Sequence, residues 1–259
     1  MEAIFPLINL LQAIFLGVWS AFCITCAFVA GLVTFRRELP LAMARTMWAP
    51  PLIAMTGSRL AVEPLPDIDW SKPHIYLMNH QSMADIACAF AGIPANLRFV
   101  AKHTLGKVPF IGWYMKFTGM ILINRSNRAA AVRSLHKAGE RIREGANIIA
   151  YPEGTRSADG TILPFKKGPF MLALEAKVPI VPVAIEGSGR MLPRDGFRIR
   201  PTLIRMKIGE PIETAHLTPA DRDDLMRRTR DIIIRMHREI GGRGGDDVAI
   251  APAGVEGRA

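Results

Sequence analysis

A histidine and an aspartate stand five positions apart where a short apolar run gives way to a helical pattern. His80 and Asp85 lie in the stretch NHQSMAD, directly after the apolar residues 74–78. Residues five apart in one continuous helix point about 140° away from each other, so His80 must lie in the turn before the helix if the two side chains are to meet. The carboxylate would then fix the imidazole tautomer and leave the other ring nitrogen free as a general base.

A simpler explanation exists for part of this stretch. Ser82 and Asp85 have the spacing of a capping box, in which both side chains satisfy backbone amides at a helix start. On that interpretation His80 is an ordinary loop residue. The two interpretations are compatible, because one carboxylate can accept a backbone N–H and an imidazole N–H at once.

Polar turns also follow two other apolar runs. The run 147–151 leads into a turn with Glu153, Gly154 and Arg156, and the run 121–124 leads into Arg125. Gly154 lets the backbone approach a ligand closely, and arginine forks suit a phosphate. An ordinary turn with an exposed Glu153–Arg156 pair is the simpler alternative. In a parallel sheet, however, these turns and the turn of His80 would converge at one edge, where α/β sheets bind ligands.

The elements that must position these turns can be predicted from hydrophobic periodicity. Strands are predicted over residues 74–78, 97–101, 121–124, 147–151, 179–185 and 203–208, and helices over 82–92, 128–143, 167–177 and 217–240. The last helix has Thr218 as its N-cap, Pro219 in its first position and Asp221 three residues after the cap. Strands that alternate with helices predict an α/β fold, with a mixed, largely parallel sheet flanked by helices.

The N-terminal segment carries no charge from Ala3 to Phe35. It is long enough to span a membrane, or to form a hairpin that dips into one leaflet. Arg36, Arg37 and Arg45 follow, which predicts that the rest of the chain lies on the cytoplasmic side of the cell (inner) membrane. Residues 40–57 either lie at the membrane interface or pack on the globular domain. We therefore expect a membrane anchor with interfacial helices over 1–58, a catalytic domain over 59–240 and a disordered tail over 241–259.

The composition favours a membrane as the anionic partner. Lys and Arg number 33 against 23 Asp and Glu, a formal net charge of +10. The arginines are spread along the chain, without a nucleic-acid motif or a basic patch interleaved with aromatic residues, so nucleic acid is not an expected partner. Cys23 and Cys26 lie in the apolar N-terminal run and are read as small hydrophobic residues.

Four sequence blocks carry a family resemblance. NHQSMAD has the form N-H-x-x-x-x-D, GMILINR resembles G-x-x-x-I-x-R, YPEGTRS resembles F-P-E-G-T-R-S with Tyr151 for Phe, and VPIVPVAI resembles V-P-I-V-P-V. In this order, over residues 79–185, they resemble the 1-acyl-glycerol-3-phosphate acyltransferases of the glycerolipid acyltransferase superfamily. Residues 101–125 also resemble that family, with Thr104 where Glu is common.

The resemblance implies a role for each matching residue. His80 would be the base that deprotonates the acceptor hydroxyl, and Asp85 would orient it. The acceptor site would comprise Arg125, Glu153, Gly154, Thr155 and Arg156, with Lys102 as an additional member. The donor would be acyl-CoA or acyl-carrier protein, the acceptor lysophosphatidic acid and the setting a phospholipid membrane, with no cofactor and no metal.

The motifs leave other functions open. The same chemistry on another lysolipid, such as lyso-ornithine lipid, would use the same residues. A non-catalytic, membrane-anchored protein that binds anionic lipid would keep the arginines but would not need His80. A hydrolase with Ser82 as nucleophile is disfavoured because Ser82 is better explained as a cap. A metal site of His80, Asp85 and Glu153 is disfavoured because no second His or Cys is placed to help.

Overall fold

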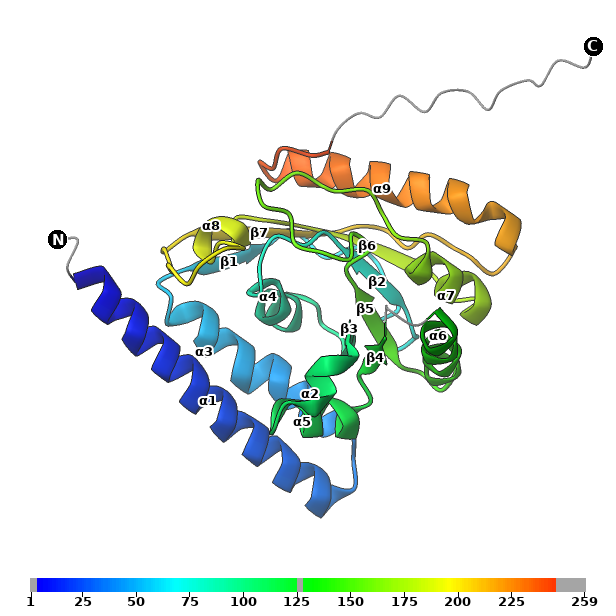
Figure 1. Ribbon diagram of the computed structural model, residues 1–259. Helices are drawn as coiled ribbons and strands as arrows, with labels where there is room; N and C mark the ends of the chain where they lie inside the picture. The colour runs from blue at the N-terminus through cyan, green and yellow to red at the C-terminus, as the bar shows by residue number, and fades with distance from the viewer. Residues whose placement is uncertain (1–3, 125–127, 246–259) are drawn as a thin grey trace, which may run out of the picture.

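A seven-stranded sheet forms the centre of the molecule, with the strand order β1-β7-β6-β2-β5-β3-β4 (Figure 1). The computed structural model describes residues 4–124 and 128–245, and their side chains except those of residues 4, 5, 128–133 and 135. The strands are β1 (Arg59–Val62), β2 (Ile75–Met78), β3 (Leu97–Lys102), β4 (Ile121–Ile123), β5 (Asn147–Ala150), β6 (Ile180–Glu186) and β7 (Leu203–Ile208).

The pairing of these strands is mostly parallel. Strands β4, β3, β5, β2 and β6 pair in parallel, whereas β7 pairs antiparallel with β6 and carries the edge strand β1. The predicted α/β class with a mixed, largely parallel sheet is therefore confirmed. All the predicted strands are present, but β1 was missed, because its four residues are half exposed and form no apolar run.

Helices cover both faces of the sheet. They are α1 (Ile4–Thr34), α2 (Glu38–Met43), η1 (Ala44–Trp48), α3 (Ala49–Ala54), α4 (Asp85–Gly92), η2 (His103–Lys107), α5 (Ile111–Thr118), α6 (Arg128–Arg143), α7 (Gly168–Ala176), α8 (Ser188–Met191), η3 (Pro219–Asp221) and α9 (Arg222–Glu239). Figure 1 shows α3 and α4 on one face and α6, α7 and α9 on the other.

The residues of β2 show why both faces must be covered. All four are fully buried; Tyr76 and Met78 face the core beneath α4, whereas Ile75 and Leu77 face the core beneath α7 and α9. A strand buried on both sides has a continuous apolar sequence, which is typical of central strands in parallel sheets.

The long C-terminal helix begins as its sequence predicts. Thr218 and Asp221 form a reciprocal capping box, and Pro219 occupies the first position. The first turn is a 3-10 turn, η3, and α9 continues from it. Residues 241–245, at the start of the predicted tail, follow α9 and form hydrogen bonds with the domain. The remainder of the predicted tail, 246–259, lies outside the described residues, and the proposed division of the chain stays a prediction.

The N-terminal apolar run forms one continuous helix, α1, instead of a hairpin. Pro6–Thr34 is long and apolar enough to cross a membrane by length and composition, and only 11% of its most apolar stretch is buried in the protein. The helix still contacts the domain, because Trp19 Nε1 donates to the Trp48 carbonyl at 3.3 Å and the rings of Phe28 and Phe117 lie 5.4 Å apart.

The segment after α1 packs into the domain core. Leu41 and Ala49 are fully buried, Ile53 is 6% exposed, and the ring of Trp48 meets that of Phe90 on α4 edge-on at 5.9 Å. Of the two placements that the sequence leaves open for residues 40–57, the structure therefore shows packing on the globular domain.

Replacing Leu41 by alanine tests this packing. Truncating a fully buried leucine removes apolar contacts and leaves a cavity, so the free energy of unfolding should fall by about 2–5 kcal/mol. Denaturation of purified protein in detergent measures the change, with Leu65→Ala as the control because Leu65 is 49% exposed. Equal, small losses in both variants would contradict the core placement.

Candidate active site

The carboxyl ends of the parallel strands bring the predicted turns to one edge of the sheet. His80 follows β2, Glu153 follows β5, Lys102 ends β3 and Glu186 ends β6. Arg125, which follows β4 in the chain, lies outside the described residues. An edge of this kind is where open α/β sheets bind ligands.

Asn79 fixes the end of β2 to the neighbouring strand β6. Its buried side-chain amide donates to the Ile185 carbonyl at 3.0 Å and accepts from the Ile185 amide at 2.8 Å. This pair continues the strand pairing with a side chain in place of backbone, so the next residue, His80, leaves the sheet from a defined position.

His80 and Asp85 are in direct contact. His80 Nδ1 lies 2.7 Å from Asp85 Oδ2, with His80 in the turn and Asp85 as the first residue of α4, the arrangement that the spacing predicts. The amides of Gln81 and Ser82 donate to the same oxygen at 2.8 and 2.9 Å. An oxygen that accepts these bonds requires Nδ1–H as a donor, which leaves a lone pair on His80 Nε2. The His80 side chain is 13% exposed, so this nitrogen is shielded but not sealed from solvent.

The helix start also uses Ser82, in a different way from the predicted capping box. The Asp85 carboxylate accepts the Ser82 amide, but Ser82 Oγ accepts the amide of Ala84, two residues on, at 3.1 Å. The hydroxyl donates to the Leu192 carbonyl at 2.7 Å, and the residue is fully buried. A hydroxyl held in this way is part of the scaffold, which disfavours Ser82 as a nucleophile.

An aromatic ring covers one face of the imidazole. Tyr151 stacks on His80 with ring centroids 3.8 Å apart and planes 13° from parallel. Burial raises the pKa of the Tyr151 hydroxyl well above 10, with the nearby carboxylate of Asp85 adding to the shift. The hydroxyl and Asp85 Oδ1 are buried and find no hydrogen-bond partner among the described residues. Hydrogen-bonding capacity therefore remains unused beside the His80–Asp85 pair.

Glu153 supports the turn of His80 through a hydrogen bond to its backbone. Its side chain is 2% exposed; Oε1 accepts the His80 amide at 2.8 Å and Oε2 accepts the Leu163 amide at 3.0 Å. Burial raises the pKa of this carboxyl to about 7, against the lowering effect of the two amides. The hydrogen bonds of Glu153 to these two backbone amides support the turn, and its place in the acceptor site stays a prediction.

The other predicted acceptor-site residues lie nearer the surface. Gly154 has a φ of +72°, in the left-handed region that favours glycine. Thr155 and Lys102 are exposed, and Arg156 is half-buried. Within the described part of the chain Arg156 forms no ion pair with Glu153, so the simple surface pair considered from the sequence is absent. Arg194 donates from Nη1 to the Arg156 carbonyl at 2.9 Å, a basic neighbour that sequence reasoning missed.

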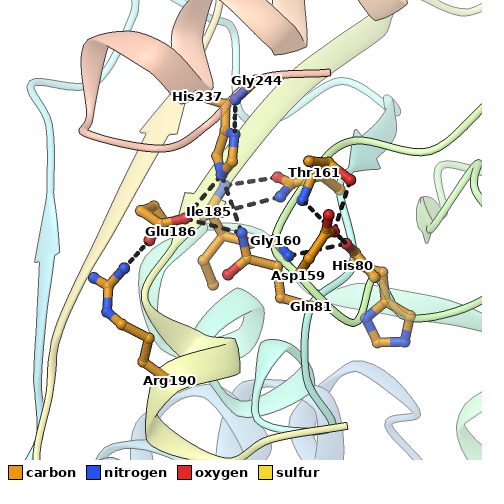
Figure 2. Close-up of polar contacts among 12 residues, drawn as sticks. His80, Gln81, Asp159, Gly160, Thr161, Ile185, Glu186, Arg190, His237 and Gly244 are labelled. Atoms are coloured by element: carbon orange, nitrogen blue, oxygen red, sulfur yellow. Dashed lines mark hydrogen bonds and ion pairs between the residues drawn. The ribbon is translucent and has the colours of Figure 1, made fainter. Parts of the chain in front are cut away.

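Sequence reasoning also missed a buried polar cluster next to the turn of His80, formed by Gln81, Glu186 and His237 (Figure 2). Glu186 had a usable signal, because it directly follows the predicted strand 179–185, whose carboxyl end faces the site. His237 had none, since it lies in a helix some 150 residues further along the chain; the contact of Gln81 with His237 spans 156 positions.

Comparisons with known proteins agree with this geometry. A family model described as Acyltransferase matches residues 59–186. The chain is 35% identical over 190 residues to the 1-acyl-sn-glycerol-3-phosphate acyltransferase of Saccharomyces cerevisiae, covering 71% of this chain and 62% of that protein. It is 30% identical over 201 residues to the human 1-acyl-sn-glycerol-3-phosphate acyltransferase alpha, covering 76% and 71%.

A solved structure extends the likeness over almost the whole chain. The crystal structure of the 1-acyl-sn-glycerophosphate (LPA) acyltransferase PlsC from Thermotoga maritima matches with a TM-score of 0.79 and 26% identity, covering 92% of this chain and 97% of that one. Fold and sequence blocks together define the acyltransferase class. The chain belongs to the 1-acyl-sn-glycerol-3-phosphate acyltransferase family. It spans 62% of the Saccharomyces cerevisiae protein, and 38% and 59% of matching proteins from Brassica napus and Limnanthes alba.

The buried carboxyl of Glu153 predicts a pH-dependent stability. Its pKa is raised from 4.5 to about 7 in the folded protein, so the folded state binds more protons between these values. The free energy of unfolding should therefore fall as the pH rises from 4.5 to 7, by about 3 kcal/mol from this group. The difference in unfolding free energy between wild type and Glu153→Gln, measured at pH 5 and pH 8, isolates the effect.

The matched control is Glu210→Gln, which changes an exposed carboxylate. Its stability curve should run parallel to that of wild type. If the unfolding free energy of Glu153→Gln also depends on pH as that of wild type does, Glu153 is not the group that binds the additional proton in the folded state.

Proposed function

We propose that the protein transfers a fatty acyl group from acyl-CoA or acyl-carrier protein to the sn-2 hydroxyl of 1-acyl-glycerol-3-phosphate, giving phosphatidic acid. The observation that carries the proposal is the 2.7 Å contact between His80 Nδ1 and Asp85 Oδ2, at the edge of the sheet where the parallel strands β2, β3, β5 and β6 end. A histidine oriented in this way has one ring nitrogen available as a general base.

The proposed reaction proceeds without an acyl-enzyme. His80 Nε2 takes the proton of the acceptor hydroxyl while the hydroxyl oxygen attacks the carbonyl carbon of the thioester. The tetrahedral intermediate then collapses, the carbon–sulfur bond breaks, and the leaving thiolate takes the proton from the imidazolium. Asp85 stabilises the imidazolium between these steps, as the third member of a catalytic triad does. No cofactor or metal takes part in the proposed reaction; acyl-CoA or acyl-carrier protein is a co-substrate.

Basic side chains are the proposed holders of the acceptor phosphate. Arg156 follows β5 and Lys102 ends β3, two neighbouring strands whose carboxyl ends lie on the edge that carries His80. Arg125, from the family block after β4, is proposed as a further member. Planar guanidinium groups bind phosphate oxygens in pairs, so they suit a phosphate close to the reacting hydroxyl.

The proposed location is the inner membrane, with the catalytic domain on the cytoplasmic side. Support comes from α1, whose length and apolar composition are sufficient to cross a bilayer. Arg36 and Arg37 follow one residue after this helix, and cytoplasmic flanks are enriched in such residues. Phospholipid membrane and lysophosphatidic acid are accordingly the proposed partners.

Replacing His80 by alanine should lower kcat by about 10²–10⁴, which is the usual contribution of a general base. Asp85→Asn should cost nearly as much, because the carboxamide no longer fixes the Nδ1–H tautomer. The measurement is acyl transfer from acyl-CoA and from acyl-carrier protein to lysophosphatidic acid by purified, folded protein.

The control for this pair is His216→Ala, since His216 is exposed on the surface. Its activity should equal that of wild type. Near-normal transfer by folded His80→Ala protein would refute the mechanism and favour a lipid-binding protein without catalysis.

Removing the Arg156 guanidinium should weaken the use of lysophosphatidic acid. A charge-assisted hydrogen bond contributes roughly 1.5–3 kcal/mol, so Arg156→Ala should lower kcat/KM by about 10–100-fold. Arg156→Lys keeps the charge but loses the fork, and should recover only part of the activity. A monoacylglycerol, which lacks the phosphate, is the comparison acceptor and should respond little to either change.

Arg143→Ala is the matched control, because Arg143 is an exposed arginine that precedes β5 at the opposite edge of the sheet. An equal loss with both acceptors would show that Arg156 does not read the phosphate. A wild type that prefers a phosphate-free lysolipid would show that the acceptor is another lysolipid.

A further inference from the structure

A buried polar cluster joins the last turns of α9 to the residue after the catalytic histidine (Figure 2). Gln81 Nε2 donates to Glu186 Oε2 at 2.9 Å, and His237 Nε2 lies 2.9 Å from the same oxygen. Arg190 forms an ion pair with the other oxygen of Glu186. His237 is fully buried and Gln81 is 3% exposed, so the contacts of these two residues with Glu186 are protected from water.

The hydrogen bonds define the protonation of His237. The amide of Gly244 donates to His237 Nδ1 at 3.1 Å, so Nδ1 is the acceptor and Nε2 carries the proton that goes to Glu186. Burial tends to raise the pKa of Glu186, but the hydrogen bonds from His237 and Gln81 outweigh it and lower this pKa to about 2. Glu186 is therefore a carboxylate whose partners are all donors.

The segment after α9 that contains Gly244 also contacts the chain next to Glu153, the second residue that supports the turn of His80. The Gly244 carbonyl accepts the amide of Ile162 at 2.8 Å, and the next amide, that of Leu163, donates to Glu153 Oε2. Glu153 Oε1 in turn accepts the His80 amide.

These contacts form a closed ring. It runs from His80 through Glu153, the peptide 162–163, Gly244, His237 and Glu186 to Gln81, which is bonded to His80 along the chain. The backbone around the catalytic histidine is thus held from both sides, and one of its two supports comes from the end of α9. A misplacement of about 1 Å in a reacting group costs as much as 10²-fold in rate.

We propose that Gln81, Glu186 and His237 are positioning residues, which hold the His80–Gln81 turn so that the imidazole meets Asp85 and the acceptor hydroxyl. In this proposal the residues 242–245 after α9 are part of the active-site support. None of the three side chains is required to touch the substrate. The kinetic part of the proposal rests on the proposed acyl transfer; the structural part does not.

The test combines two substitutions of residues in this ring of contacts. His237→Phe keeps an aromatic side chain but removes both hydrogen-bonding nitrogens, and Gln81→Leu keeps a side chain of similar volume but removes its donor. Each should lower kcat about 10–100-fold and leave KM for lysophosphatidic acid within about twofold. Because both act through one ring, the double variant should lose little more than either single variant.

The second readout is the imidazole proton of His80 that is bonded to Asp85, followed by NMR and assigned by its absence in His80→Ala. Both variants should shift or abolish this signal. Glu239→Gln is the matched control, because it removes the negative charge that pairs with Lys207 at 2.7 Å near the same end of α9 and changes none of the residues in the ring of contacts. It should leave the signal, kcat and KM unchanged.

A lower kcat together with a changed His80 signal, without additivity in the double variant, supports the proposal. An unchanged His80 signal in folded variants overturns the proposal, whatever their activity. Losses of kcat that are additive in the double variant and that follow the fall in melting temperature also overturn it. If His237→Phe does not fold, Gln81→Leu decides alone by the same two readouts. If wild type acylates no lysolipid, the proposed function fails, and the NMR signal alone then supports or overturns the ring.

Discussion

One oxygen atom, Oδ2 of Asp85, organises the site. It accepts the imidazole of His80 and the amides of Gln81 and Ser82, so the same atom ends the turn, starts α4 and orients the histidine. The carboxylate is fully buried, which makes each of these bonds costly to lose. The rest of the fold keeps the two chain segments around this oxygen in register, with β2 fixed to β6 through Asn79.

Burial has a different effect on each carboxylate near the site. Glu186 receives side-chain donors and an arginine, and its pKa falls to about 2 against the effect of burial. Glu153 receives only backbone amides, and burial raises its pKa to about 7. Glu186 accepts from three side chains, one of them a cation, whereas Glu153 accepts from two backbone amides, and only the first set of donors outweighs the effect of burial. Two structurally similar supports of one turn therefore respond differently to pH.

The sequence predicted those elements well whose structure is determined by residues that are close together in the chain. The central strands have continuous apolar runs, and the start of α9 has a complete capping box in Thr218 and Asp221. The His80–Asp85 contact was also predictable, because the two residues are five apart. His237 was not, because nothing in a helical pattern specifies which buried polar side chain meets a turn 156 positions earlier. Edge strand β1 was missed for a related reason. Its four residues form no apolar run, and it is a strand because its backbone pairs with that of β7, which lies far along the chain.

The single helix α1 affects how the protein would meet a lipid substrate. It is joined to α5 by the contact of Phe28 with Phe117, and α5 follows η2 at the carboxyl end of β3. If α1 lies in a bilayer, as proposed, the edge of the sheet that carries His80 is held near the lipid surface. Encounter then becomes a two-dimensional search, in which the rate depends on the mole fraction of acceptor in the surface and dilution with inert lipid slows the reaction at constant bulk concentration.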